Sequence, residues 1–132
     1  MPRRLSAWYV TGLCEGDGSF TFYRNGPKNV ALVFALKQPA AGVRVLEDVR
    51  AYFGCGSLYA SERGAALRIV RAADLLKILA HFDKHPLKGK KARRYALWRE
   101  AVLLKQRRYR VDQDKLDDVL AALARLRDAG QA

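Results

Sequence analysis

The sequence has little of what builds disulfide-rich, zinc-binding or membrane-spanning proteins. It holds two cysteines, Cys14 and Cys55, in 132 residues, too few for a disulfide framework or a four-cysteine zinc set. The longest apolar runs, such as Val30–Leu36, are far shorter than the roughly 20 residues of a spanning helix. No uninterrupted apolar stretch follows the first residues, so we expect no signal peptide. The composition predicts a soluble intracellular protein with reduced thiols.

Acidic residues are also scarce. Asp and Glu number 13 against 25 Lys and Arg, which gives a net charge of +12 and a pI near 10.2. This excess favours a polyanionic partner, with nucleic acid ahead of an anionic membrane surface. A hydrophobic content of 50% argues against disorder, and the length predicts one domain over residues 1–132. The two histidines, His81 and His85, have no cysteine nearby, so we expect surface residues rather than a metal site.

Hydrophobic periodicity and turn residues predict an α+β domain. Helices are expected from Ser6 to about Gly16, over 41–53, from about Asp74 to the break at His85-Pro86, over 88–107, and from Val111-Asp112 onward. Strands are expected over 19–24, 30–38, 57–61 and 65–70. The order gives an αββαββα core with a four-stranded antiparallel sheet, helices on one face, and C-terminal helices beyond it.

The sheet face away from the helices is predicted to be polar and aromatic, without a central acid. On the strands other than the second, alternation directs one set of side chains outward: Ser19, Thr21, Tyr23, Asn25, Ser57, Tyr59, Ser61 and Arg68. Inward positions include Phe20, Phe22, Leu58, Ala60, Leu67 and Ile69. The second strand directs Ala31, Val33, Ala35 and Lys37 outward, which indicates either contacts to thymine methyl groups or a partly covered face. The whole face is either plainly solvated or, as the net charge favours, a DNA-facing surface.

The segment Val10–Gly18 carries the most chemical information. Gly12 and Gly16 are spaced to lie on one helix face, where the missing side chains permit close approach of another backbone. Glu15 and Asp17 follow at the helix end whose dipole is already negative, an unfavourable place for carboxylates. The alternatives are a solvated acidic helix end and a site for a hard divalent cation such as Mg²⁺, which prefers oxygen ligands.

The same segment resembles the signature of the LAGLIDADG homing endonuclease family. Gly12, Leu13, Glu15, Asp17 and Gly18 match the pattern, and a Ser-Phe pair follows as it often does in the family. The departures, Val10, Thr11, Cys14 and Gly16, are all small or apolar. The chain contains one such motif, so it resembles the homodimeric branch, in which the motif helices of two subunits pack together.

The resemblance implies a function for these residues. Asp17, with the Gly16 carbonyl, would bind Mg²⁺ or another divalent cation, and Gly12, Leu13 and Gly16 would form the dimer interface. Gln38 would order water near the metal, and Lys90 would be the basic residue of the cleft, with Lys88 or Lys91 as alternatives in an uncertain register. The basic run over residues 84–110 favours phosphate contact as well. The residues expected to contact DNA are Ser19, Thr21, Tyr23, Asn25, Lys37, Tyr59, Ser61, Arg68, Lys88 and Lys91.

The family implies a site-specific, Mg²⁺-dependent endodeoxyribonuclease that makes double-strand breaks in a long, roughly palindromic target. Its partners would be double-stranded DNA and a second copy of the chain, without a membrane or a small-molecule substrate. Its location would be a bacterial or archaeal cytoplasm or an organelle. An RNA maturase, or a DNA-binding regulator that no longer cleaves, is the alternative on the same fold. Lineages of that kind often lose the acid that Asp17 provides.

Overall fold

The computed structural model describes residues 1–26, 29–106 and 112–128. Its helices are α1 (Ala7–Asp17), α2 (Val43–Phe53), α3 (Ala72–Lys84), α4 (Lys91–Lys105) and α5 (Gln113–Asp128), with a short 3-10 turn, η1 (Ala40–Gly42). Its strands are β1 (Gly18–Arg24), β2 (Val30–Gln38), β3 (Ser57–Ser61) and β4 (Gly64–Ile69). The end of the basic run 84–110 and the predicted start of the last helix at Val111 lie outside the described ranges. No helix within those ranges is both long and apolar enough to cross a membrane.

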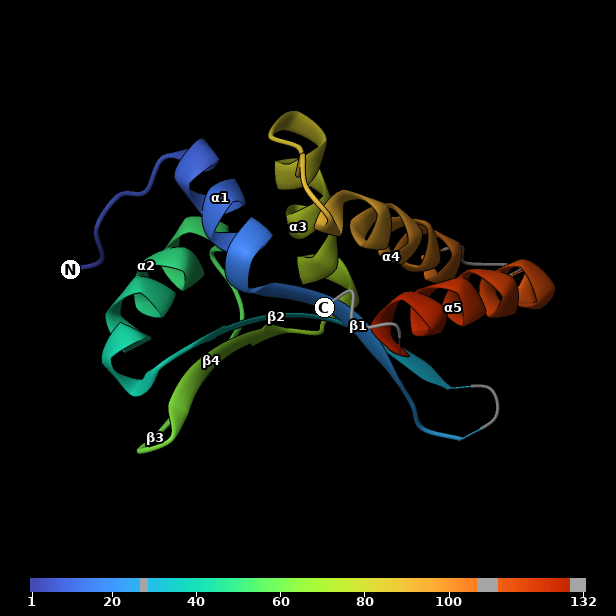
Figure 1. Cartoon of the computed structure of the whole chain (residues 1–132), viewed down its shortest axis with the longest axis horizontal. Coiled ribbons are helices and arrows are strands. Elements are labelled where there is room, and N and C mark those ends of the chain that lie inside the picture. Colours follow the sequence, from blue (N-terminus) through green and yellow to red (C-terminus); the bar gives the residue numbers. More distant parts are fainter. Residues whose placement is uncertain (27–28, 107–111, 129–132) are drawn as a thin grey trace.

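The strands form one antiparallel sheet in the order β1-β2-β4-β3. All of the α-helices lie on one side of it, and the sheet arches so that both hairpins bend away from them (Figure 1). None of the described helices lies on the opposite, concave face. This arrangement confirms the predicted α+β fold, with its four-stranded sheet and C-terminal helices.

Local signals explain the boundaries of the motif helix and its neighbours. The Ser6 side chain accepts a hydrogen bond from the Tyr9 backbone N–H at 3.2 Å and begins α1. Gly54 ends α2 with φ at +72°, a left-handed conformation that glycine adopts without strain. Helix α4 begins at Lys91 rather than at the predicted residue 88. The backbone N–H groups of residues 88 and 89 donate instead to the side chain of Glu15 in α1.

An aromatic core fixes α4 against the first strand. The ring of Phe20 lies 5.2 Å from Tyr95 and 5.2 Å from Trp98, measured between centroids. Since β1 is an edge strand, some of its backbone groups need other partners. Arg94 Nε donates to the Phe20 carbonyl and Trp98 Nε1 donates to the Thr21 carbonyl, each at 3.0 Å. These contacts hold α4, and with it the basic run, beside the start of β1.

On the three strands other than β2, the predicted alternation is correct except at the far edge of the sheet. Phe20, Phe22, Leu67 and Ile69 are buried under the helices, and Leu58 is half-buried. Ala60, predicted to point into the core, is exposed. The reason is its position near the tip of the edge strand β3, which projects beyond the helices (Figure 1). Inward-pointing residues of β3 are therefore covered only as far as the helices extend, and the strand continues beyond that point.

Candidate active site

Asp17 ends α1 and meets the end of β2. Its carboxylate Oδ2 accepts a hydrogen bond from Gln38 Nε2 at 2.7 Å, so the structure joins two residues that are 21 positions apart in the chain. Glycine makes this packing possible, since a Cβ on Gly42 would lie 2.8 Å from the Gln38 Cβ and one on Gly18 would lie 2.7 Å from the Cys14 carbonyl oxygen. The turn that follows each residue therefore fits closely around the pair.

A buried lysine approaches the same helix end. Lys91 Nζ donates to the Gly16 carbonyl at 3.0 Å and to the Cys14 carbonyl at 3.4 Å, and the residue is 7% exposed. Burial lowers the pKa of Lys91, although the charge of Asp17 acts in the opposite direction. The two carbonyl oxygens lie at the negative end of the α1 helix dipole, so they stabilise the positive charge of this ammonium group.

The side chains of the other two candidate lysines do not bond to the end of α1 in the part of the chain that the structure describes. Lys90 is exposed and makes no hydrogen bond or ion pair within the described residues. Lys88 is exposed, and its Nζ lies 5.1 Å from the centroid of the Trp8 ring. Of the three lysines that the sequence left open, Lys91 is the one whose side chain contacts the end of α1. Which of them takes part in the reaction stays a prediction.

The two acids of the motif face different partners. Glu15 Oε1 accepts hydrogen bonds from the backbone N–H groups of Lys88 at 2.8 Å and Gly89 at 2.7 Å, just before α4 begins. The charge of Glu15 is thus compensated by backbone donors near a helix N-terminus. Asp17 alone keeps an exposed carboxylate at the end of α1.

The oxygen atoms at this helix end suit a hard divalent cation. The Asp17 carboxylate and the Gly16 carbonyl are the ligand types that Mg²⁺ takes, and Mg²⁺ usually keeps several waters as well. The hydrogen bond from Lys91 uses one lone pair of the Gly16 carbonyl and leaves the second. No cluster of three or more His, Cys, Asp or Glu side chains occurs in the described ranges. A cation here would therefore have few ligands from this chain.

The concave sheet face carries the predicted polar residues. Tyr23, Asn25, Lys37, Tyr59 and Ser61 are exposed, and Ser19, Thr21 and Arg68 are half-buried. The Arg68 guanidinium reaches across the sheet to lie 5.3 Å from the centroid of the Tyr23 ring. Between their strands lies β2, where Val33 is 1% exposed. Of the two readings of the second strand, a partly covered face describes Val33 and Ala35.

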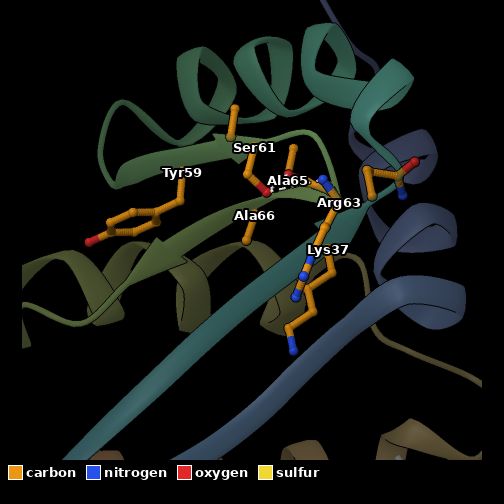
Figure 2. Close-up of a pocket in the computed structure, with 9 residues that line it drawn as sticks. Lys37, Tyr59, Ser61, Arg63, Ala65 and Ala66 are labelled. Carbon is orange, nitrogen blue, oxygen red and sulfur yellow. Dashed lines mark hydrogen bonds between the residues drawn. The ribbon is translucent and has the colours of Figure 1, made fainter.

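A hollow of about 390 Å³ lies at the other end of this face, beside Gln38. Lys37, Ala66 and Tyr59 form one row across three strands, and the small central residue makes the depression. Lys37 of β2 and Arg63 of the β3–β4 turn both line this hollow, and Figure 2 labels them among its lining residues. Arg63 was not among the residues predicted to contact DNA, and the signal that could have indicated it is its place in a tight turn between two strands with outward polar residues.

One face of α1 is open. A Cβ on Gly12 or on Gly16 would have no heavy atom within 4 Å. Trp8 and Tyr9 on the same helix are 52% and 50% exposed, and Leu13 is half-buried. The two glycines leave room for a closely packed partner, and the exposed aromatic side chains beside them offer apolar surface for it to cover.

His81, which we expected on the surface, lies in the core and tethers α1. It is 7% exposed, with Nε2 2.9 Å from Thr11 Oγ1 and Nδ1 2.8 Å from the Tyr52 hydroxyl. The single proton of the Thr11 hydroxyl is donated to the His85 carbonyl at 2.8 Å. His81 therefore donates from Nε2 and accepts at Nδ1, as a neutral imidazole. Its role is structural, since it joins α1, α2 and α3.

This buried imidazole predicts acid sensitivity. Burial, and to a smaller degree His85, lowers the pKa of His81 from 6.5 to about 4. The unfolded chain binds this proton more readily, so stability falls as the pH drops from about 6.5 toward 4, by about 1–2 kcal/mol at pH 5. Urea unfolding at pH 7 and pH 5 measures the loss. The variant His81→Phe keeps the ring but not the titration, and an equal loss in both proteins would contradict the assignment.

The fold and the site define a class: an α+β protein whose motif helix delivers an acid to the edge of an open, arched sheet. Residues 10–102 match the family model of the LAGLIDADG endonucleases. Because this match covers most of the chain, the chain belongs to the LAGLIDADG endonuclease family.

Individual relatives agree with the family. The chain is 34% identical over 106 residues to a "probable intron-encoded endonuclease" of Schizosaccharomyces pombe, a match over 76% of this chain and 27% of the relative. It is 30% identical over 109 residues to a protein in ND4 intron 1 of Podospora anserina, again over 76% of this chain but 24% of that one. The chain thus spans about a quarter of the length of these curated relatives.

Solved structures share the whole fold. A homing endonuclease, I-TnaI, superposes with a TM-score of 0.82 at 25% identity, and the match covers 96% of each chain. I-SmaMI bound to an uncleaved DNA target in the presence of calcium ions gives a TM-score of 0.82 at 26% identity, over 91% of this chain but 45% of the other. The same fold thus occurs in a chain of matching extent and within a chain about twice as long.

Proposed function

We propose that the chain is a homing endonuclease that cleaves double-stranded DNA at a specific site with the help of a divalent cation, Mg²⁺ above others. The observation that carries the proposal is the contact of Asp17 with Gln38 at the end of the motif helix, where Lys91 also donates to the Gly16 carbonyl. Membership of the endonuclease family and the likeness to I-SmaMI, a protein seen with DNA and calcium ions, support it.

Each residue of the cluster has a role in this proposal. Asp17 and the Gly16 carbonyl hold the cation, and Gln38 fixes the Asp17 carboxylate and orients water. Lys91 places a positive charge where a phosphate would gain negative charge. A bound divalent cation makes water more acidic and offsets charge that develops during phosphoryl transfer.

The arched sheet would supply affinity and selectivity. Its outward side chains combine donors, acceptors and cations, which base edges and phosphates require. The predicted DNA contacts at Ser19, Thr21, Tyr23, Asn25, Lys37, Tyr59, Ser61 and Arg68 share this face, and Arg63 joins them. Lys88 lies elsewhere, on Trp8 of the motif helix, so its DNA contact rests on the basic run alone.

The proposal includes a homodimer of residues 1–132. One chain provides one Asp17, and cleavage of both strands needs two such sites. I-SmaMI is about twice as long as this chain, whereas I-TnaI has the same extent. A second copy on the open face of α1 would place two arched sheets around a two-fold axis. Such a dimer would bind a roughly palindromic DNA target. The site of action would be inside a cell or organelle, where such DNA lies.

A cleavage assay with and without Mg²⁺ tests the proposed nuclease activity. The protein is incubated with a library of duplexes that have a randomised centre, in Mg²⁺ or in EDTA, and the cut ends are sequenced. We expect cleavage only with Mg²⁺, at ends that cluster around one sequence with two-fold symmetry. Binding to DNA or RNA without cleavage at any sequence would instead favour a regulator or a maturase, which the relatives do not favour.

A further inference from the structure

The carboxylate of Glu15 forms a clamp between α1 and the segment before α4. One oxygen, Oε1, accepts from two successive backbone N–H groups, those of Lys88 and Gly89, at 2.8 and 2.7 Å. The fit is close on the other side as well, because a Cβ on Gly89 would lie 3.0 Å from the Glu15 carboxyl carbon. Two backbone donors for one charged acceptor make a strong contact.

The clamp acts at the point where α4 begins. The Gly89 carbonyl accepts from the Ala92 backbone N–H at 3.1 Å, so the clamped residue also starts the first turn of the helix. Lys91 lies in that turn, and its Nζ returns to the carbonyls of Cys14 and Gly16 on the same motif helix. The chain therefore makes a closed loop of contacts: Glu15 to the backbone at 88–89, that backbone to Lys91, and Lys91 to the residues beside Glu15.

We propose that Glu15 is a positioning residue for Lys91. By holding the backbone at 88–89, Glu15 keeps the Lys91 ammonium group at the end of the motif helix. The proposal rests on the proposed function only for its effect on cleavage, since the placement of Lys91 exists without DNA or metal. It assigns the two acids of the motif separate tasks, with Glu15 organising the basic residue and Asp17 holding the cation.

Chemical labelling of the free protein tests the placement directly. The amines are acetylated with an N-hydroxysuccinimide ester, and mass spectrometry compares Lys91 with Lys90, its exposed neighbour on the same segment. In the wild type we expect Lys91 to react about tenfold more slowly than Lys90, because its amine opens to solvent only when local contacts break.

Two variants at Glu15 separate the clamp from its charge. Glu15→Gln keeps a carbonyl oxygen that accepts both backbone N–H groups, so protection of Lys91 should persist. Glu15→Ala removes the acceptor, and the labelling of Lys91 relative to Lys90 should rise about tenfold. Continued protection of Lys91 in Glu15→Ala, while circular dichroism shows a folded protein, would overturn the proposal. Loss of protection in Glu15→Gln would overturn the hydrogen-bond mechanism.

A double-mutant cycle tests the consequence for cleavage. Glu15→Ala should slow single-turnover cleavage about tenfold in the wild-type background, with rescue by Glu15→Gln. In a Lys91→Ala background the same change should have less than a twofold effect, because the residue it positions is gone. A full tenfold effect in both backgrounds would show that Glu15 acts independently of Lys91. If the wild type cleaves no DNA, the proposed function fails, whereas the labelling result still decides the positioning role.

Discussion

Asp17→Asn lowers the cleavage rate at least about a thousandfold and leaves the affinity for DNA within a few-fold of the wild type. The substitution keeps the size of the side chain and an oxygen that can accept the hydrogen bond from Gln38. It removes the negative charge on which a divalent cation depends. Charge stabilisation by a metal is worth several kcal/mol, and each 1.36 kcal/mol is a factor of ten in rate.

The measurement is single-turnover cleavage of the duplex recovered from the randomised library, with Mg²⁺ in excess, together with DNA binding in Ca²⁺. Asp114→Asn is the matched control, because this exposed acid in the first turn of α5 changes the net charge equally. We expect it to cleave at the wild-type rate. Cleavage by Asp17→Asn within tenfold of the control would remove Asp17 from the proposed metal site.

The resemblance to the family implied that Gln38 lies near Asp17, whereas it left the identity of the lysine open. The motif pattern gives the position of Asp17, and Gln38 stands at the end of a predicted strand. The lysine depends on where α4 begins, and that point is set by Glu15, a residue more than seventy positions away whose carboxylate holds the backbone at 88–89. Local periodicity carries no record of such a contact.

The same limit applies to the other differences. His81 follows an apolar helical pattern, but its burial is made possible by hydroxyl groups on two other helices, Thr11 and Tyr52. Val33 was predicted to point outward and is 1% exposed, and the Arg68 and Tyr23 side chains from the two neighbouring strands meet across β2. In each case the deciding partner comes from another element, whereas alternation along one strand or helix was sufficient for the fold.

Gly12→Leu should convert the protein to monomers and abolish double-strand cleavage. A leucine on the open face of α1 would occupy the space that a second motif helix needs for close approach. Among the described residues of one chain, a Cβ at Gly12 would have no heavy atom within 4 Å, so a side chain can start there without a clash. Replacing a glycine inside a helix also raises helix propensity by up to about 1 kcal/mol.

Gly12→Leu is therefore expected to weaken dimerisation while it stabilises the single chain, and the two effects can be measured separately. By light scattering the variant should have the mass of one chain, while thermal unfolding at low protein concentration should show a monomer at least as stable as the wild-type chain. Ala96→Leu, at an exposed position of α4, adds a bulky side chain away from α1 and should leave the dimer intact. A dimer that persists in Gly12→Leu would move the interface off this helix, and with it the assembly of two Asp17 residues that cleavage of both strands requires.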